Sequence, residues 1–198
     1  MKKKQFRKKI FANVGFFLYL CAHFFGNHTY LATLINIDRM KNKKENIAEY
    51  ILYLWQLEDY LRAFPEMAEG NEELSDILRM MHADDVMDGG HIQLAQIALK
   101  ELEELSDDIL AQEATFRAAM IRITPSLNLL KARTDRPAMS NIEACLVLLY
   151  QIMMLRLQHR EISAETQEVQ QQATGILQYL SKTYYKQGEL EDDDQATL

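Results

Sequence analysis

The chain has 198 residues, enough for one domain with a sizeable core, and its composition is helical, with few Gly and Pro residues. Its net charge of −7 is unevenly distributed, because residues 1–45 carry +8 and the remainder carries −15. An acidic body disfavours nucleic acid as the main partner. Cys21 and Cys145 cannot form a disulfide framework, which favours a reducing compartment.

Residues 1–39 form a basic and then apolar extension. The stretch 10–26 resembles an export signal but is short for a membrane span, which needs about 20 residues. Three interpretations stay open: a signal peptide, a membrane anchor, or upstream translation before a true start at Met40. We favour Met40, because the helical pattern begins directly after it, and this predicts a cytoplasmic protein. A genuine signal or anchor would instead make the protein exported or membrane-bound.

The first three predicted helices follow from Met40 onward. Asn46 with Glu49 resembles a capping box, so the first helix should begin at about Ile47 and stop before Pro65. Apolar residues at spacings of three and four predict two more helices, separated by two glycines. Their expected ranges are 72–87 and 91–112.

Three further helices are predicted in the second half of the chain. The fourth has apolar residues from 116 to 130 and contains Pro125, which predicts a kink or two helices meeting. Ser140 and Glu143 form a capping box for the fifth, which should run to about Gln158. The sixth begins near Ser163. The sequence therefore predicts an all-α fold: a compact bundle of five to six mostly antiparallel helices.

The predicted domain organisation has three parts. Residues 1–39 are the N-terminal extension, residues 40–188 form the helical bundle domain, and residues 189–198 form an acidic tail that should be disordered.

A resemblance to a known family is carried by three stretches, ENIAEYILYLWQLEDYLRA, GGHIQL and NIEACLVLLYQIMMLRLQHREISAETQ. Together they resemble an uncharacterised bacterial all-helical family, known only as a domain of unknown function. The similarity covers about residues 44–186. It implies a small helical bundle and supports Met40 as the start, and it implies no activity, cofactor or site.

Two charges interrupt apolar helix faces. At about 100° per residue, Glu58 falls in the middle of the apolar side of the first helix, whereas Asp59 falls on the polar flank. Arg156 lies on the apolar stripe of the fifth helix. A lone buried carboxylate is costly, so we expect a buried structural ion pair between Glu58 and Arg156. The alternative is that Arg156 reaches solvent and Glu58 meets a hydroxyl such as that of Tyr150.

No catalytic motif is present in the sequence. A di-iron bundle needs Glu-x-x-His, which does not occur, and a three-histidine site would need His82, His91 and His159 to converge. A ligand or metal site using His91 and Glu58 remains an alternative. We therefore predict no cofactor and a non-enzymatic protein–protein interaction module, as a homodimer or with a protein partner. A metal-dependent enzyme of helical-bundle type is the second hypothesis.

Overall fold

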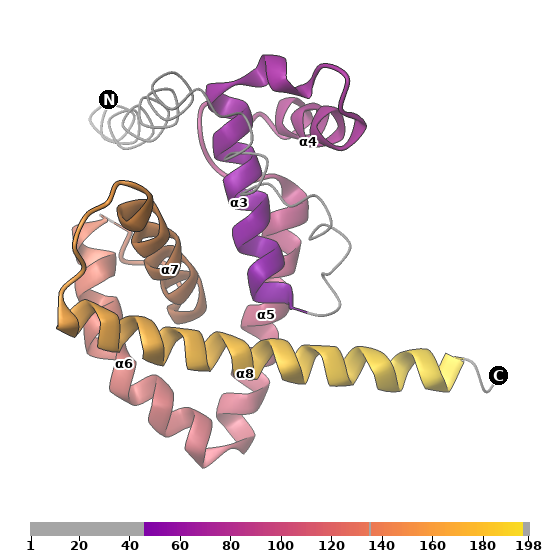
Figure 1. Ribbon diagram of the computed structural model, residues 1–198. Coiled ribbons are helices and arrows are strands. Elements are labelled where there is room, and N and C mark those ends of the chain that lie inside the picture. The colour runs from indigo at the N-terminus through magenta and orange to yellow at the C-terminus, as the bar shows by residue number, and fades with distance from the viewer. Residues whose placement is uncertain (1–45, 135, 196–198) are drawn as a thin grey trace. The chain divides into compact units, whose positions relative to one another are not determined.

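The computed structural model describes residues 46–134 and 136–195 (Figure 1). The chain is all-α, as predicted: these ranges contain six α-helices, one short 3-10 helix and no strand. The helices fall into two compact units. Among the described residues, the first unit holds Ile51–Ile97, and the second holds 46–50 and everything from Ala98 onward.

The predictions for the N-terminal extension, including its membrane segment 10–26 and the start at Met40, lie outside the described residues. Within the described ranges, none of the helices combines the length and the apolar character that crossing a membrane requires.

The first half of the chain contains α3 (Ile47–Ala63), the 3-10 helix η2 (Pro65–Ala68) and α4 (Glu72–Ala83). The start of α3 follows the sequence prediction, because Oδ1 of Asn46 accepts a hydrogen bond of 3.2 Å from the backbone N–H of Glu49. Pro65 follows the end of α3 and is the first residue of η2, a position that its fixed φ favours.

Helix α4 ends at Ala83, before the predicted end at residue 87. Asp85 adopts the left-handed conformation, with a φ of 54°. Its N–H donates to the carbonyl of His82, and the N–H of Val86 donates to the carbonyl of Met81 at 3.0 Å. This pair of bonds is a Schellman closure, which satisfies the last carbonyls of the helix without a glycine at that position.

The second half contains α5 (Gln93–Gln112), α6 (Ala114–Arg133), α7 (Asn141–Leu157) and α8 (Ala164–Gln195). Helices α6, α7 and α8 pack against one another in the second unit (Figure 1). Their packed faces are apolar, as the helical periodicity predicts. The fully buried side chains of this unit include those of Leu102, Ile123, Leu127, Leu146 and Leu180.

Two details of these helices differ from expectation. Helix α6 is one continuous helix through Pro125, so the alternative of two separate helices is wrong. Helix α8 continues to Gln195 and therefore includes most of the segment predicted to be a disordered acidic tail.

The capping prediction for α7 is confirmed. Oγ of Ser140 accepts a hydrogen bond of 2.9 Å from the N–H of Glu143, and it also donates to the carboxylate of Glu103. The start of α7 is thus fixed both by its own cap and by a carboxylate of α5.

Candidate functional site

The most unusual side chain of the first unit is Glu58, which is completely buried on α3. The helical angle predicted this position, since Leu54 and Leu61 on the same side of the helix are also fully buried. Asp59, expected on the polar flank, is buried as well, with 8% exposure. The prediction for Asp59 was wrong; its carboxylate is buried and pairs with the guanidinium of Arg62, one turn further along α3.

The carboxylate of Glu58 is bound by the segment that leads into α5. Its Oε1 accepts a hydrogen bond of 3.1 Å from the N–H of Ile92, and its Oε2 lies 2.7 Å from Nδ1 of His91. Ile92 immediately precedes α5, so its N–H is one of the orphan donors of a helix start. Glu58 therefore caps α5 from another helix and places a negative charge at its positive end.

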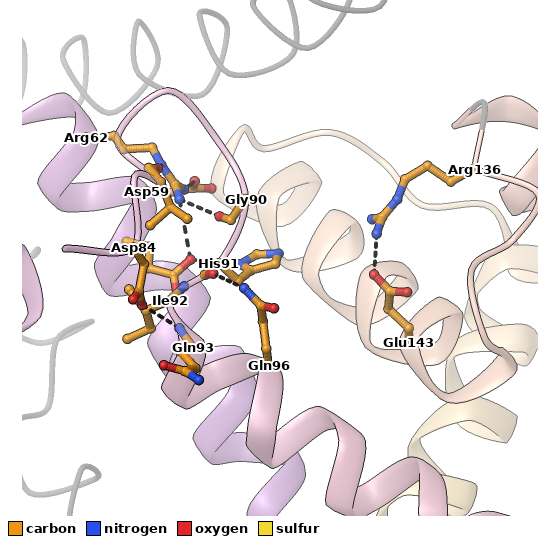
Figure 2. A network of polar contacts seen from close by, with 12 residues as sticks. Asp59, Arg62, Asp84, Gly90, His91, Ile92, Gln93, Gln96, Arg136 and Glu143 are labelled. Carbon is orange, nitrogen blue, oxygen red and sulfur yellow. Dashed lines mark hydrogen bonds and ion pairs between the residues drawn. The ribbon is translucent and has the colours of Figure 1, made fainter. Parts of the chain in front are cut away.

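Arg62 completes the arrangement from the next turn of α3. Its Nη1 lies 2.8 Å from Oδ1 of Asp59, and its Nη2 lies 3.5 Å from Oε2 of Glu58. The same guanidinium donates to two loop carbonyls, that of Val86 at 3.1 Å and that of Gly90 (Figure 2). Its five donors in a planar fork allow one side chain to make all these contacts.

We call Glu58, Asp59, Arg62 and His91 the Glu58 clamp. It binds the loop between α4 and α5 through Val86, at one end, and through residues 90–92 at the other. The glycines in this loop have φ values of 136° and 103°, a region that other residues rarely adopt. The clamp thus holds a backbone path that needs glycine, which explains why two glycines precede the histidine.

The ring of His91 is fixed on a second side by Trp55. The two rings stack with centroids 4.5 Å apart and an interplanar angle of 18°. The tryptophan is only 4% exposed, whereas the side chain of His91 retains 30% exposure. His91 is therefore the one member of the clamp that reaches solvent to any large extent.

Two outer hydrogen bonds support the same turn of chain. Oδ2 of Asp84 accepts a bond of 2.6 Å from the N–H of Gln93, and the side chain of Gln96 donates to the carbonyl of His91 (Figure 2). Two backbone N–H groups at the start of α5, those of Ile92 and Gln93, are thus bound by side chains of α3 and of the loop.

Glu58 and Arg156, the predicted buried pair, each have other partners in the structure. Arg156 is exposed on α7, and its Nη2 donates to Oε1 of Gln170 at 2.8 Å. It lies in the last turn of α7, where a long side chain reaches water easily and where a cation is favourable. The proposed hydroxyl alternative for Glu58 does not describe its contacts either, because an imidazole, a guanidinium and a backbone N–H surround the carboxylate.

The structure does bring together His91 and Glu58, the two residues of the alternative ligand site. Their donor set does not suit a metal ion, because Oε1 of Glu58 is taken by an N–H and Oε2 lies beside the cation of Arg62. Within the described ranges, no group of three or more His, Cys, Asp or Glu residues could hold a metal ion.

The other two histidines considered for metal binding have local positions of their own. His82 is exposed in the last turn of α4. His159 follows α7 with a φ of 52°, and its N–H donates to the carbonyl of Arg156 at 2.9 Å. With the bond from the N–H of Arg160 to the carbonyl of Leu155, this is a second Schellman closure. His159 is thus part of a helix end.

Sequence reasoning missed Arg62 as a partner of Glu58, although a signal for it was present. The two residues are four positions apart, the spacing at which a Glu and a following Arg meet on one helix face. The contribution of Val86 and Gly90 had no such signal, because it depends on the path of a loop.

The protein is all-α. Its Glu58 clamp is a group of polar side chains, mostly buried, through which α3 binds the loop that leads into α5. The chain belongs to the family DUF4924, described as a domain of unknown function, which it matches over residues 37–74 and 65–191. This agrees with the resemblance inferred from the sequence. Neither the curated proteins nor the solved structures include a match to this chain.

Proposed function

We propose that the protein is a non-enzymatic helical interaction module whose contact surface is the outward face of α6. The observation that supports this proposal is that α6 has two apolar faces. One is buried and includes Phe116 and Met120. The other is exposed and contains the two most exposed large apolar side chains of the described residues, those of Ile121 and Leu129.

The outward stripe is continuous along the helix. At about 100° per residue, its members lie within one narrow sector, about 180° from the centre of the buried face. Ile121 and Leu129 are 68% and 62% exposed. Single exposed apolar residues are common, but a continuous stripe marks a contact surface. We call the following set the α6 stripe: Ala118, Ile121, Pro125, Leu129 and Ala132.

A second copy of the chain is the partner that the stripe suits best. Its spacing reads the same in both directions from Pro125: a large aliphatic residue four positions away on each side, then an alanine three further on. An antiparallel pair of α6 helices centred on Pro125 would place Ile121 of one chain beside Leu129 of the other. Such self-complementarity is what a two-fold symmetric interface requires.

The charges of α6 predict that the association of two copies depends on salt concentration. The helix carries Arg117, Arg122, Lys131 and Arg133, and it contains no acidic residue. Two copies would bring like charges together, so added salt should strengthen their association by screening the repulsion. An acidic partner would show the opposite dependence.

The test is the molar mass of the full chain in solution, measured by size-exclusion chromatography with light scattering at low and high salt. We expect a dimer that is favoured by salt and weakened by Ile121→Asp and by Leu129→Asp. Ile97→Asp is the matched control, because this residue is also an exposed isoleucine, at 46%, on α5. A chain that stays monomeric at all concentrations, or equal effects of the three variants, would refute the homodimer.

We also propose a cytoplasmic location. Cys145 is a free, buried thiol in the described structure, and the small number of cysteines suits a reducing compartment. Fractionation of the native protein, together with mass spectrometry of its N-terminus, tests this and the proposed start at Met40. A mature protein that retains residues 10–35 would contradict the Met40 start.

A further inference from the structure

A second feature of the second unit lies beside the α6 stripe and has a different chemistry. Helices α6 and α8 enclose a cleft with a volume of about 310 Å³. This is at the lower end of the volumes that hold small organic ligands, roughly 300–1,000 Å³. The lining residues are Thr115, Phe116, Ala119, Arg122, Gln171, Gln172, Gly175, Ile176 and Tyr179.

The inner wall of the cleft is apolar and partly aromatic. Phe116 and Ile176 line the cleft but are only 5% and 4% exposed, whereas Tyr179 is 40% exposed and offers the larger apolar surface. The ring of Tyr179 contacts that of Phe116 with centroids 5.6 Å apart. The hydroxyl of Tyr179 donates to Glu113 at 2.5 Å, so this residue offers the cleft its ring. Such a wall suits a planar or aliphatic hydrocarbon group.

Open space in the cleft is maintained by Gly175. A Cβ atom built at this position would meet no atom within 4 Å, and the backbone there is ordinary helix. Glycine is unfavourable in a helix interior compared with alanine. Its presence is therefore explained neither by the backbone conformation nor by close packing, and its effect is to leave room beside the apolar wall.

The rim of the cleft carries one charge, the guanidinium of Arg122. This side chain is exposed, and within the described ranges it has no hydrogen bond or ion pair. Gln171 and Gln172 line the facing helix, and Nε2 of Gln172 also donates to Oε1 of Glu168 at 3.4 Å. A guanidinium with amide donors nearby matches a carboxylate, which accepts hydrogen bonds in pairs.

We propose that this cleft binds a small organic carboxylate with an aromatic or aliphatic body. The hydrocarbon body lies against the ring of Tyr179, in the space left by Gly175, and the carboxylate pairs with Arg122. The cleft shares no residue with the α6 stripe, the apolar surface of the proposed dimer.

The test uses the full chain and two probes of nearly equal shape, 1-naphthaleneacetate and its neutral amide, in calorimetric titrations. We expect saturable binding of the carboxylate, about tenfold tighter than that of the amide because one charge-assisted pair distinguishes them. Arg122→Gln should remove this difference. Gly175→Leu, whose side chain would occupy the cleft, should weaken both probes by more than tenfold.

Each variant has a matched control. Arg133→Gln removes an exposed cation from the same helix, and Gly188→Leu changes a second glycine of α8 that also has open space around it. Neither residue lines the cleft. Ile121→Asp removes the proposed dimer surface and should leave probe binding unchanged. Absence of saturable carboxylate binding, or unaltered affinity in a folded Gly175→Leu variant, would overturn the proposal.

Discussion

Nδ1 of His91 lies 2.7 Å from Oε2 of Glu58, although the two residues are 33 positions apart in the chain. Which of the two atoms donates depends on the tautomer of the His91 ring. The contact joins the end of a glycine-containing loop to the middle of an apolar helix. Its role in this structure is to fix the loop and the start of α5.

Replacing Glu58 should cost more stability than replacing Arg156. Glu58→Gln puts an amide donor against other buried donors, so we expect the free energy of unfolding to fall by about 2–3 kcal/mol. Arg156→Met changes an exposed side chain and should stay within about 0.5 kcal/mol of the parent. Urea unfolding of both variants measures the difference. The reverse order would mean that the contacts described for Glu58 do not stabilise the fold.

Arg62→Lys should loosen the loop that the clamp holds. A lysine cannot reproduce the fork that serves Asp59, Val86 and Gly90 together, so we expect a loss of about 2 kcal/mol. Amide hydrogen exchange should accelerate over residues 84–92. Arg79→Lys is the control, because Arg79 makes a similar short-range pair with Asp76 at 77% exposure. Equal exchange in both variants would argue against the clamp.

Gly175→Ala should stabilise the protein. The position is helical and has open space for a Cβ atom, so the gain is the helix propensity of alanine over glycine, about 1 kcal/mol. The melting temperature should rise by roughly 2–4 °C. Gly70→Ala is the opposite case, because Gly70 has a φ of +75° and the substitution should lower the melting temperature. Calorimetry of both variants measures whether each melting temperature rises or falls.

Cys145 should be unreactive in the folded protein. Burial raises the pKa of its thiol from 9.0 to about 12, and the side chain is fully buried. In a Cys21→Ser background, a thiol reagent at pH 8 should react only after denaturant is added. Because the folded pKa is the higher one, this thiol's contribution to stability is complete below pH 9 and is lost as the pH rises toward 12. Rapid reaction without denaturant would contradict this burial.

The sequence was informative where a local rule governs the structure. The cap at Ser140, the end of α3 before Pro65 and the burial of Glu58 each depend on residues within one or two turns of helix. The early end of α4 was not foreseen, because a non-glycine residue, Asp85, takes the left-handed conformation there.

The partner of Glu58 was beyond helix-angle reasoning. The prediction paired the two charges because each lies on an apolar helix face. Whether such a charge is buried also depends on its position along the helix, and Arg156, in the last turn of α7, can extend into water. The actual partners include two backbone groups, the N–H of Ile92 and, through Arg62, the carbonyl of Gly90. Backbone groups are the same in every sequence, so no residue pattern marks them as partners.

The contacts of the Glu58 clamp described above join residues that are close in the sequence; Glu58 and Ile92, for example, are 34 positions apart. Closing so short a loop costs little chain entropy, and short-range contacts form early in folding. During synthesis, every residue of the clamp is added to the chain before those of α6, α7 and α8. The buried carboxylate can therefore find its partners on the nascent chain and spend little time exposed to wrong ones.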